Sequence, residues 1–493
     1  MERRGTGPER VVEKTLRRWF RPLWYLGNNR LSQLGIMLTS ASVITFVSFM
    51  TTAFFGVPLG PYVGILAFLA LPAIFVLGLL LIPLGIWHRR RAETRSGRLP
   101  AEYPPIDFRR SETRETFWFV AVMTGVNVIV FLTASYRAVH HMESVEFCGA
   151  TCHTVMQPEY TAYQGATHAR VQCVACHVGP GAPWFVRSKL SGTYQLLALT
   201  FDFYPRPIPT PIDNLRPSRD TCERCHWPEK FVGDKLIVKT HFSDDETAIE
   251  SKTVLLMHTG GVDPLTHEPL GNHGVHLEPG GEIRYAAADR GRQDIPYVRY
   301  RTPRGEVVEY TSDGGKGPTG PRDESTLRRM DCMDCHNRPA HPFELPAPAV
   351  DAALGARLLD RTLPYAKKQG VEVLQARAYA SADEAAAGIR AGLRDFYASR
   401  YPRLLEDRGD AVDAAAGVLA GIYARNVFPA MRVSWGTYAK NLGHVDFPGC
   451  LRCHDGKHKS VDGREIPSAC DTCHALLALD DPDPDILKQL AAP

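Results

Sequence analysis

Long stretches of this sequence lack charge. No aspartate, glutamate, lysine or arginine occurs from Leu31 to Trp87. Val57-Pro-Leu-Gly-Pro61 divides this run into two segments, each at least the ~20 residues that a helix needs to cross a bilayer. A third uncharged run, from Phe117 to Tyr136, is again about one bilayer long. These absences exclude a wholly soluble protein and predict three transmembrane helices, two within 31–87 and one at 117–137.

Basic residues are missing from the loop between the first two predicted helices, which sets the orientation. Residues 1–30 carry eight lysines and arginines, and residues 88–116 carry eight more. Because positive charge stays on the cytoplasmic side, we expect a cytoplasmic N-terminus, a cytoplasmic loop at 88–116 and an exported remainder. Basic and aromatic residues in 1–30 predict an amphipathic segment on the membrane surface, with a solvated basic tail as the alternative. No cleavable signal peptide is expected, because the first apolar run is full length.

No cysteine stands alone, because all twelve fall in six pairs and a histidine follows each pair directly. The cysteines are Cys148, Cys152, Cys173, Cys176, Cys222, Cys225, Cys332, Cys335, Cys450, Cys453, Cys470 and Cys473, and the histidines are His153, His177, His226, His336, His454 and His474. Zinc sites of four thiolates and disulfides need no histidine after every pair. The pattern is typical of covalent haem attachment, in which the thiols add to the vinyl groups and the histidine binds iron. It predicts six c-type haems.

The exported part is acidic. Haem is attached in this way on the outer side of the cytoplasmic membrane, which agrees with the expected topology. Without 1–30 and 88–116, the chain has 41 basic and 46 acidic residues, out of totals of 57 and 54. This balance favours a basic redox partner and does not favour nucleic acid.

Cysteine and histidine are both absent from Pro342 to Leu442. The alanine-rich helical spacing there predicts a haem-free helical module at 346–440. On either side we expect a haem domain at 138–345 with motifs one to four, and a C-terminal haem segment at 441–493 with motifs five and six. Short apolar segments between glycine, proline and aspartate predict a small β-rich insertion at 252–312. The expected fold is a membrane-anchored multihaem cytochrome c, mainly α-helical with loop-rich haem-binding regions.

Low-spin electron-transfer haems take a second axial ligand beyond the motif histidine. Twelve other histidines remain, of which His88 lies on the cytoplasmic side. Favoured as second ligands are His168, His241, His276, His444 and His458, followed by His273 and His341. A solvated or packed histidine is the alternative at each position. For the first haem, whose motif has three residues between its cysteines, the candidate is Met156; a core methionine is the alternative.

Several segments after the third predicted helix carry a family resemblance. They are the haem motif directly behind that helix, His168-Ala-Arg-Val-Gln-Cys-Val-Ala-Cys-His177, Phe185-Val-Arg-Ser-Lys189 and Thr221-Cys-Glu-Arg-Cys-His-Trp-Pro228. Together they resemble the NapC/NirT/NrfH family of membrane-anchored multihaem quinol dehydrogenases. The resemblance covers about residues 117–240, and the tail from Asn426 is similar to larger members with additional haems and spans.

The resemblance implies that menaquinol is oxidised beside the first haem and that electrons then pass outward. It also implies that Met156 ligates that haem and that Lys189 lines the quinol site together with a nearby acid. The chain departs from this pattern, because no carboxylate lies within seven residues after Lys189. Gln195 stands there instead, and Asp202 and Glu159 are the nearest substitutes for the proton acceptor that quinol oxidation requires.

The leading hypothesis is a hexahaem quinol dehydrogenase of the bacterial inner membrane that reduces a soluble periplasmic redox protein, such as a cytochrome. The main alternative is an electron-transfer subunit of a larger respiratory complex in which a partner handles the quinol. A terminal multihaem reductase is less favoured, because no CxxCK motif marks an open iron. Both a homo-oligomer and a complex subunit are compatible with the sequence.

Overall fold

The structure is a computed structural model that divides into two compact units, with the boundary in the chain between Met142 and Glu143. It describes residues 21–54, 70–103, 108–109, 111–151, 153–212, 215–227, 231, 233–263, 265–266, 268–277, 280–313 and 324–491. Most of the expected basic segment at 1–30, the break at 57–61 and Cys152 lie outside the described residues. The two units are described separately below.

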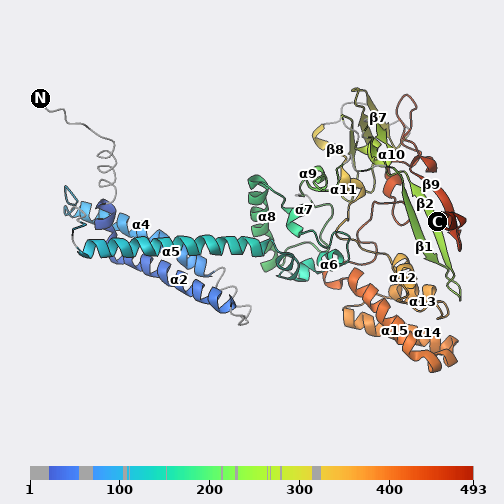
Figure 1. Ribbon diagram of the computed structural model, residues 1–493, viewed down its shortest axis with the longest axis horizontal. Coiled ribbons are helices and arrows are strands. Elements are labelled where there is room, and N and C mark those ends of the chain that lie inside the picture. The colour runs from blue at the N-terminus through green and yellow to red at the C-terminus, as the bar shows by residue number, and fades with distance from the viewer. Residues whose placement is uncertain are drawn as a thin grey trace. The chain divides into compact units, whose positions relative to one another are not determined.

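The described part of the first unit contains the long helices α2 (Arg30–Phe54), α4 (Leu71–Arg95) and α5 (Ser111–Met142) (Figure 1). α2 and α4 are long and apolar enough to cross a membrane. They expose large apolar side chains such as Met37 and Leu80, as helices facing lipid do. α5 is one continuous helix over the third expected span, and its crossing of the membrane stays a prediction.

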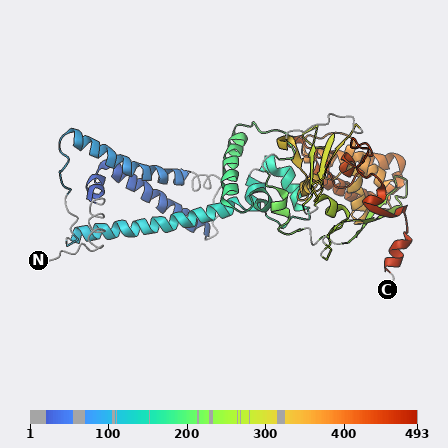
Figure 2. The same cartoon turned by 90° about the horizontal axis from the view of Figure 1, so that it is seen from above.

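α2 and α4 approach each other through small residues, and Figure 2 shows this pair from a second direction. A Cβ atom added at Gly78 would lie 2.4 Å from the Thr39 hydroxyl oxygen, and one added at Gly35 would lie 2.6 Å from the Gly78 carbonyl oxygen. The Ser32 hydroxyl donates to the Ile82 carbonyl oxygen at 2.9 Å. Small and hydroxyl-bearing residues let membrane helices pack closely and hydrogen-bond. These positions therefore specify how the two helices pair.

The second unit carries the cysteine motifs on short helices and turns. These are the π-helical turn η2 (Phe147–Thr151), α6 (His153–Gln164), α7 (Cys173–His177), α8 (Ala182–Thr200), α9 (Ser218–Cys222), α11 (Cys332–Cys335), η6 (Gly449–Arg452) and η7 (Cys470–Thr472). α9 lies next to both α7 and α11. Further short elements are α10 (Gly271–His276), η4 (Glu324–Thr326) and α16 (Asp485–Ala491).

The described part of the second unit also holds three antiparallel sheets. The first has the order β1 (Lys235–Phe242), β2 (Glu250–Met257), β9 (His474–Asp481). The second has the order β7 (Val307–Thr311), β6 (Tyr297–Arg301), β5 (Glu282–Ala286), β8 (Arg328–Arg329). β3 (Gly261–Val262) and β4 (Pro269–Leu270) form a third.

The expected strand segments do not form one self-contained insertion. β2 pairs with β9 from the far end of the chain, with Met257 opposite His474. β9 has the sequence His-Ala-Leu-Leu-Ala-Leu-Asp-Asp, which lacks the β-branched and aromatic residues that favour strands. Its pairing with β2 imposes the extended conformation, and residue preferences alone do not reveal it.

The stretch without cysteine and histidine forms a helical bundle. Its elements are α12 (Pro346–Gly355), α13 (Ala366–Gln375), α14 (Ala382–Arg400), α15 (Pro402–Asn426) and the turn η5 (Pro429–Met431). The Ser381 side chain accepts the Glu384 N–H and caps α14. The core is apolar, and Leu354, Leu374, Ile389 and Ile422 are completely buried. The core of this bundle therefore consists of apolar side chains and needs no haem.

The buried Leu354 should carry much of the stability of this bundle. Leu354→Ala leaves a cavity in the core and should cost about 2–5 kcal/mol of local stability. Leu358 lies nearby and is 64% exposed, so Leu358→Ala is the matched control and should change little. Hydrogen–deuterium exchange of the haem-loaded protein measures the effect as faster exchange in α12 and α15. Equal protection of the two variants would contradict this account of the core.

Candidate haem sites

Each cysteine pair of which both members are described lies on one tight turn. The second and fourth pairs lie within α7 and α11, and in the other three the N–H of the second cysteine donates to the carbonyl oxygen of the first. In three motifs the N–H of the histidine donates to the carbonyl oxygen of the first cysteine: His226 to Cys222 at 2.8 Å, His336 to Cys332 at 2.8 Å and His454 to Cys450 at 3.1 Å. A helical turn places residues three and four apart on one face, so both thiols and the ring point the same way. The geometry is that required for two thioether bonds and one axial ligand on the same macrocycle.

The first motif has one residue more than the others, and its turn differs accordingly. Phe147–Thr151 is π-helical, and a π-helix holds more residues per turn than an α-helix. The wider turn accommodates the additional residue after Cys148. Met156 follows on α6 and is half-buried.

Five pairs of histidine rings lie across from one another in the second unit. The distances between ring centroids are 6.1 Å for His168 and His226, 6.2 Å for His177 and His341, 6.2 Å for His273 and His336, 5.9 Å for His276 and His454, and 6.2 Å for His444 and His474. An imidazole nitrogen binds a metal at about 2 Å, so two imidazoles on opposite sides of one metal ion have ring centroids about 6 Å apart. Each pair joins one motif histidine to one other histidine. The residues present therefore fit axial ligation of five haem irons.

Hydrogen bonds at Nδ1 orient four of these rings. Each of the four Nδ1 atoms lies within hydrogen-bond distance of a backbone carbonyl oxygen: His168 with Pro339 at 3.1 Å, His276 with Asn272 at 2.7 Å, His341 with Glu159 at 2.9 Å and His454 with Pro467 at 2.6 Å. A carbonyl oxygen can only accept a hydrogen bond, so Nδ1 carries the proton in each of these rings. Nε2 is then left with a free lone pair for a metal.

Two further rings keep a buried nitrogen without a protein partner. Among the described residues, the Nδ1 atoms of His273 and His474 are buried and make no hydrogen bond. Buried polar atoms normally have a partner. Burial, and then the neighbouring His336, lowers the pKa of His273, and burial, and then His341, lowers the pKa of His177. Neutral imidazole is the form that binds a metal, so His177 and His273 fit the ligand role.

Two histidines that the sequence favours as second ligands, His241 and His458, are not among the five pairs. His458 is buried, and both its nitrogens make hydrogen bonds, Nδ1 with the Asp455 carboxylate at 2.8 Å and Nε2 with the Ile295 carbonyl oxygen at 2.7 Å. His241 lies on β1 with its Nδ1 3.6 Å from the Asp351 carboxylate. His273 and His341, which the sequence ranks lower, take their places in the pairs. We therefore do not propose His241 and His458 as iron ligands.

The motifs follow one another in space in the order of the sequence. The side chains of Cys148 and Cys173 share a hydrogen bond, as do those of Cys222 and Cys332. In the other neighbouring motifs the thiols lie near enough to influence each other electrostatically: Cys176 and Cys225, Cys335 and Cys450, and Cys450 and Cys473. Every motif thus lies near the next one along the chain, so that the motifs form a row from the first to the sixth.

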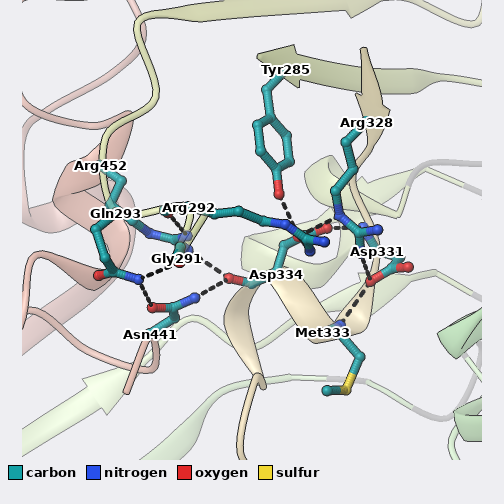
Figure 3. A network of polar contacts seen from close by, with 10 residues as sticks. All are labelled: Tyr285, Gly291, Arg292, Gln293, Arg328, Asp331, Met333, Asp334, Asn441 and Arg452. Carbon is teal, nitrogen blue, oxygen red and sulfur yellow. Dashed lines mark hydrogen bonds and ion pairs between the residues drawn. The ribbon is translucent and has the colours of Figure 1, made fainter. Parts of the chain in front are cut away.

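A buried carboxylate fixes the fourth motif (Figure 3). Asp334 lies between the two cysteines of that motif and is 2% exposed. Its Oδ1 accepts from the Tyr285 hydroxyl at 2.5 Å, from Arg328 Nε at 2.9 Å and from Arg292 Nη1 at 3.3 Å. Burial, and then the charge of Asp334, raises the pKa of the Tyr285 hydroxyl. Tyr285 therefore stays protonated and acts as a donor.

The backbone of the same residue connects to the fifth motif. The Asp334 carbonyl oxygen accepts from Arg452 Nη2 at 2.5 Å and from Asn441 Nδ2 at 3.0 Å (Figure 3). Arg452 lies between the cysteines of the fifth motif and also donates to the Arg292 carbonyl oxygen at 2.8 Å. Buried polar networks rigidify the structure around them. This network therefore holds the fourth and fifth motifs at a fixed separation.

The residues expected at a quinol site do not gather around Lys189. The Lys189 ammonium lies over the Phe185 ring, 4.9 Å from its centroid, on α8. Glu159 pairs with Arg338 through both carboxylate oxygens at 3.1 Å. Asp202 pairs with Arg206 at 2.5 Å, and Gln195 donates to the Ser191 hydroxyl at 3.3 Å. Glu159 instead borders the His177–His341 pair, because its carbonyl oxygen accepts from His341.

Comparison with known proteins identifies the family of the chain. A family described as the NapC/NirT cytochrome c family, N-terminal region, matches residues 110–204. The cytochrome c-type protein ImcH of Geobacter sulfurreducens is 40% identical over 469 residues, which cover 94% of this chain and 90% of that protein. No solved structure matches. The chain thus belongs to the NapC/NirT cytochrome c family, as the sequence resemblance predicts, and is a membrane-anchored electron-transfer protein with covalently bound haem.

Removing one ring of a pair should open an iron. His276→Ala should create a position for roughly one carbon monoxide molecule per reduced chain, because the second axial ligand is lost. His241→Ala is the matched control and should bind none there, since His241 faces Asp351. Absorption spectra with and without carbon monoxide measure this. An open iron in the His241 variant, or none in the His276 variant, would contradict the pairing.

Removing the charge of Asp334 should destabilise the second unit. Asp334→Asn leaves Arg292 and Arg328 without their shared carboxylate, and breaking a buried ion pair costs about 3–5 kcal/mol. Asp413→Asn removes an exposed carboxylate that pairs with Arg394 and should change little. Thermal unfolding of the haem-loaded protein, followed by circular dichroism, compares the two. Similar midpoints would exclude a structural role for the buried carboxylate.

Proposed function

We propose that this chain binds six haems, oxidises menaquinol at the periplasmic face of the cytoplasmic membrane and passes the electrons to a soluble periplasmic acceptor. The observation that carries this proposal is the row of five paired histidines along consecutive cysteine motifs. The sixth haem of the proposal is the first in sequence, with His153 and Met156 as its ligands. Charge in the sequence supports the orientation, with basic residues concentrated in 1–30 and 88–116.

The paired rings support electron transfer and argue against a terminal reductase. Bound haem supplies an iron that exchanges one electron between its ferrous and ferric states. A histidine on each side of the iron leaves no position for a substrate to bind. His168, His273, His276, His341 and His444 are the second ligands in this proposal. All five haems so ligated would transfer electrons and perform no chemistry on a substrate.

The surface of α8 supports contact with the membrane. Five large side chains at helical spacing are mostly exposed: Val186 at 55%, Leu190 at 69%, Tyr194 at 63%, Leu197 at 50% and Phe201 at 70%. Exposed apolar patches of this kind mark interaction sites. α8 follows the second haem motif within the region that matches the family, and the stripe fits the apolar part of a bilayer that holds the quinol.

Lys189 is the candidate for binding the quinol head group. It lies on α8 between exposed apolar residues, where a lysine holds its ammonium at the membrane–water boundary. It can donate a hydrogen bond to a quinol oxygen. Oxidation then releases two electrons, which leave one at a time, and two protons. Asp202 follows Lys189 by thirteen residues and lies beyond the end of α8. Glu159 is held by Arg338. Neither carboxylate is therefore the proton acceptor in this proposal, and we assign the protons to water at the surface of α8.

An electron-transfer subunit without its own quinol site remains the second candidate. It is favoured by one observation, namely that Glu159, Gln195 and Asp202 each have another partner away from Lys189. In that case a partner protein would oxidise the quinol and deliver electrons to the first motif.

Direct reduction by quinol distinguishes the two candidates. The haem-loaded protein in detergent is mixed anaerobically with a reduced menaquinol analogue, and the haem absorption bands are followed. We expect rapid reduction that Lys189→Ala slows about tenfold to a hundredfold, the effect of losing a hydrogen bond of 1–3 kcal/mol. Lys239→Ala on β1 is the matched control and should not slow it. Reduction by dithionite but not by quinol would show that a partner performs the oxidation.

A further inference from the structure

The edge strand β9 presents an apolar surface directly after the sixth motif. It begins at His474, the last motif histidine, and occupies the edge of the β1-β2-β9 sheet. Leu476 is 52% exposed and Leu479 is 64% exposed. Within the second unit, β9 and the C-terminus lie at the opposite end from α8 (Figures 1 and 2). Because the motifs form a row, the surface lies at the far end of the row from the first motif.

The C-terminal segment that carries these leucines is acidic. Residues 470–491 contain five aspartates and one lysine. Asp483 and Asp485 are 79% and 86% exposed, and Lys488 reaches both, at 2.7 Å and 2.9 Å. The single lysine offsets only part of the charge. An apolar centre with a charged rim is the composition of a transient protein–protein interface.

The charge decides what can cover this surface. A second copy of the chain would bring two acidic rims together, and like charges at an interface oppose association. Strand addition is also opposed, because the pairing of β9 with β2 shifts register twice and irregular edges resist the addition of a further strand. A basic protein would meet the opposite charge, which steers encounter and fixes orientation.

We infer that Leu476, Leu479 and the aspartates of the same C-terminal segment form the docking surface for a basic, lysine-rimmed electron carrier. Electrons then leave the chain at the sixth motif. This inference rests on the proposed function for the direction of electron flow. One electron leaves this chain and one is gained by the oxidised haem protein that docks. No bond is made or broken, and no proton is transferred.

Binding to a lysine-rich probe tests the surface. Air-oxidised, haem-loaded protein in detergent is titrated by calorimetry with oxidised mitochondrial cytochrome c at low ionic strength. The double variant Asp483→Asn/Asp485→Asn should weaken binding roughly fivefold and flatten its salt dependence, because rim charges act through long-range attraction. The matched control is Asp395→Asn/Asp407→Asn, which removes two exposed carboxylates from α14 and α15 and should bind as the parent does.

A second variant and a modified probe complete the test. Leu479→Ser should also weaken binding roughly fivefold while the salt dependence persists, because it removes apolar contact and no charge. Cytochrome c with succinylated lysines should not bind. Equal affinity of the Asp483/Asp485 and Asp395/Asp407 variants, or binding of the succinylated probe, would overturn the inference. Both proteins are oxidised and no quinol is present, so the outcome is independent of the Lys189 experiment.

Discussion

Two imidazoles on opposite sides of one iron must lie about 6 Å apart, and this chain draws the two from distant segments. His177 pairs with His341, and His276 pairs with His454. Each of the five haems proposed between paired histidines would therefore join two segments by coordination as well as by its thioether bonds. This explains how a unit made largely of short helices and loops keeps a defined shape. Among the described residues, the largest core of buried apolar side chains is that of the helical bundle of α12 to α15.

Polar contacts fix the distances between neighbouring haem motifs, which ligation of each iron by itself does not determine. The buried Asp334 connects the fourth motif to the fifth through Arg452. The pairing of β2 with β9 holds the sixth motif, because His474 at the start of β9 lies opposite Met257. Electron transfer between neighbouring centres depends on their separation. The buried network is thus a structural requirement of function, although none of its residues binds iron.

The sequence alone predicts the cysteine motifs, their histidines, the apolar helices and the family, because each of these is a local pattern. The sequence alone ranks the candidates for the second axial ligand less well. His458 lies four residues after His454, but its nitrogens are taken by Asp455 and Ile295. His341 lies five residues after a motif histidine and pairs with a different motif, that of His177. Distance along the chain does not measure distance in a fold built from crossing segments. β9 escapes prediction for a related reason, since its leucines and alanines become a strand only by pairing with β2.

The pairing of His177 with His341 also constrains how the protein is made. In the proposed topology, the second motif would cross the membrane long before its partner ring, which follows 164 residues later in the sequence. The second haem would therefore pass through a stage with one protein ligand, and most of the haem domain must be exported before its coordination is complete. In that topology, an interrupted export would leave the second haem with an open iron position near the membrane.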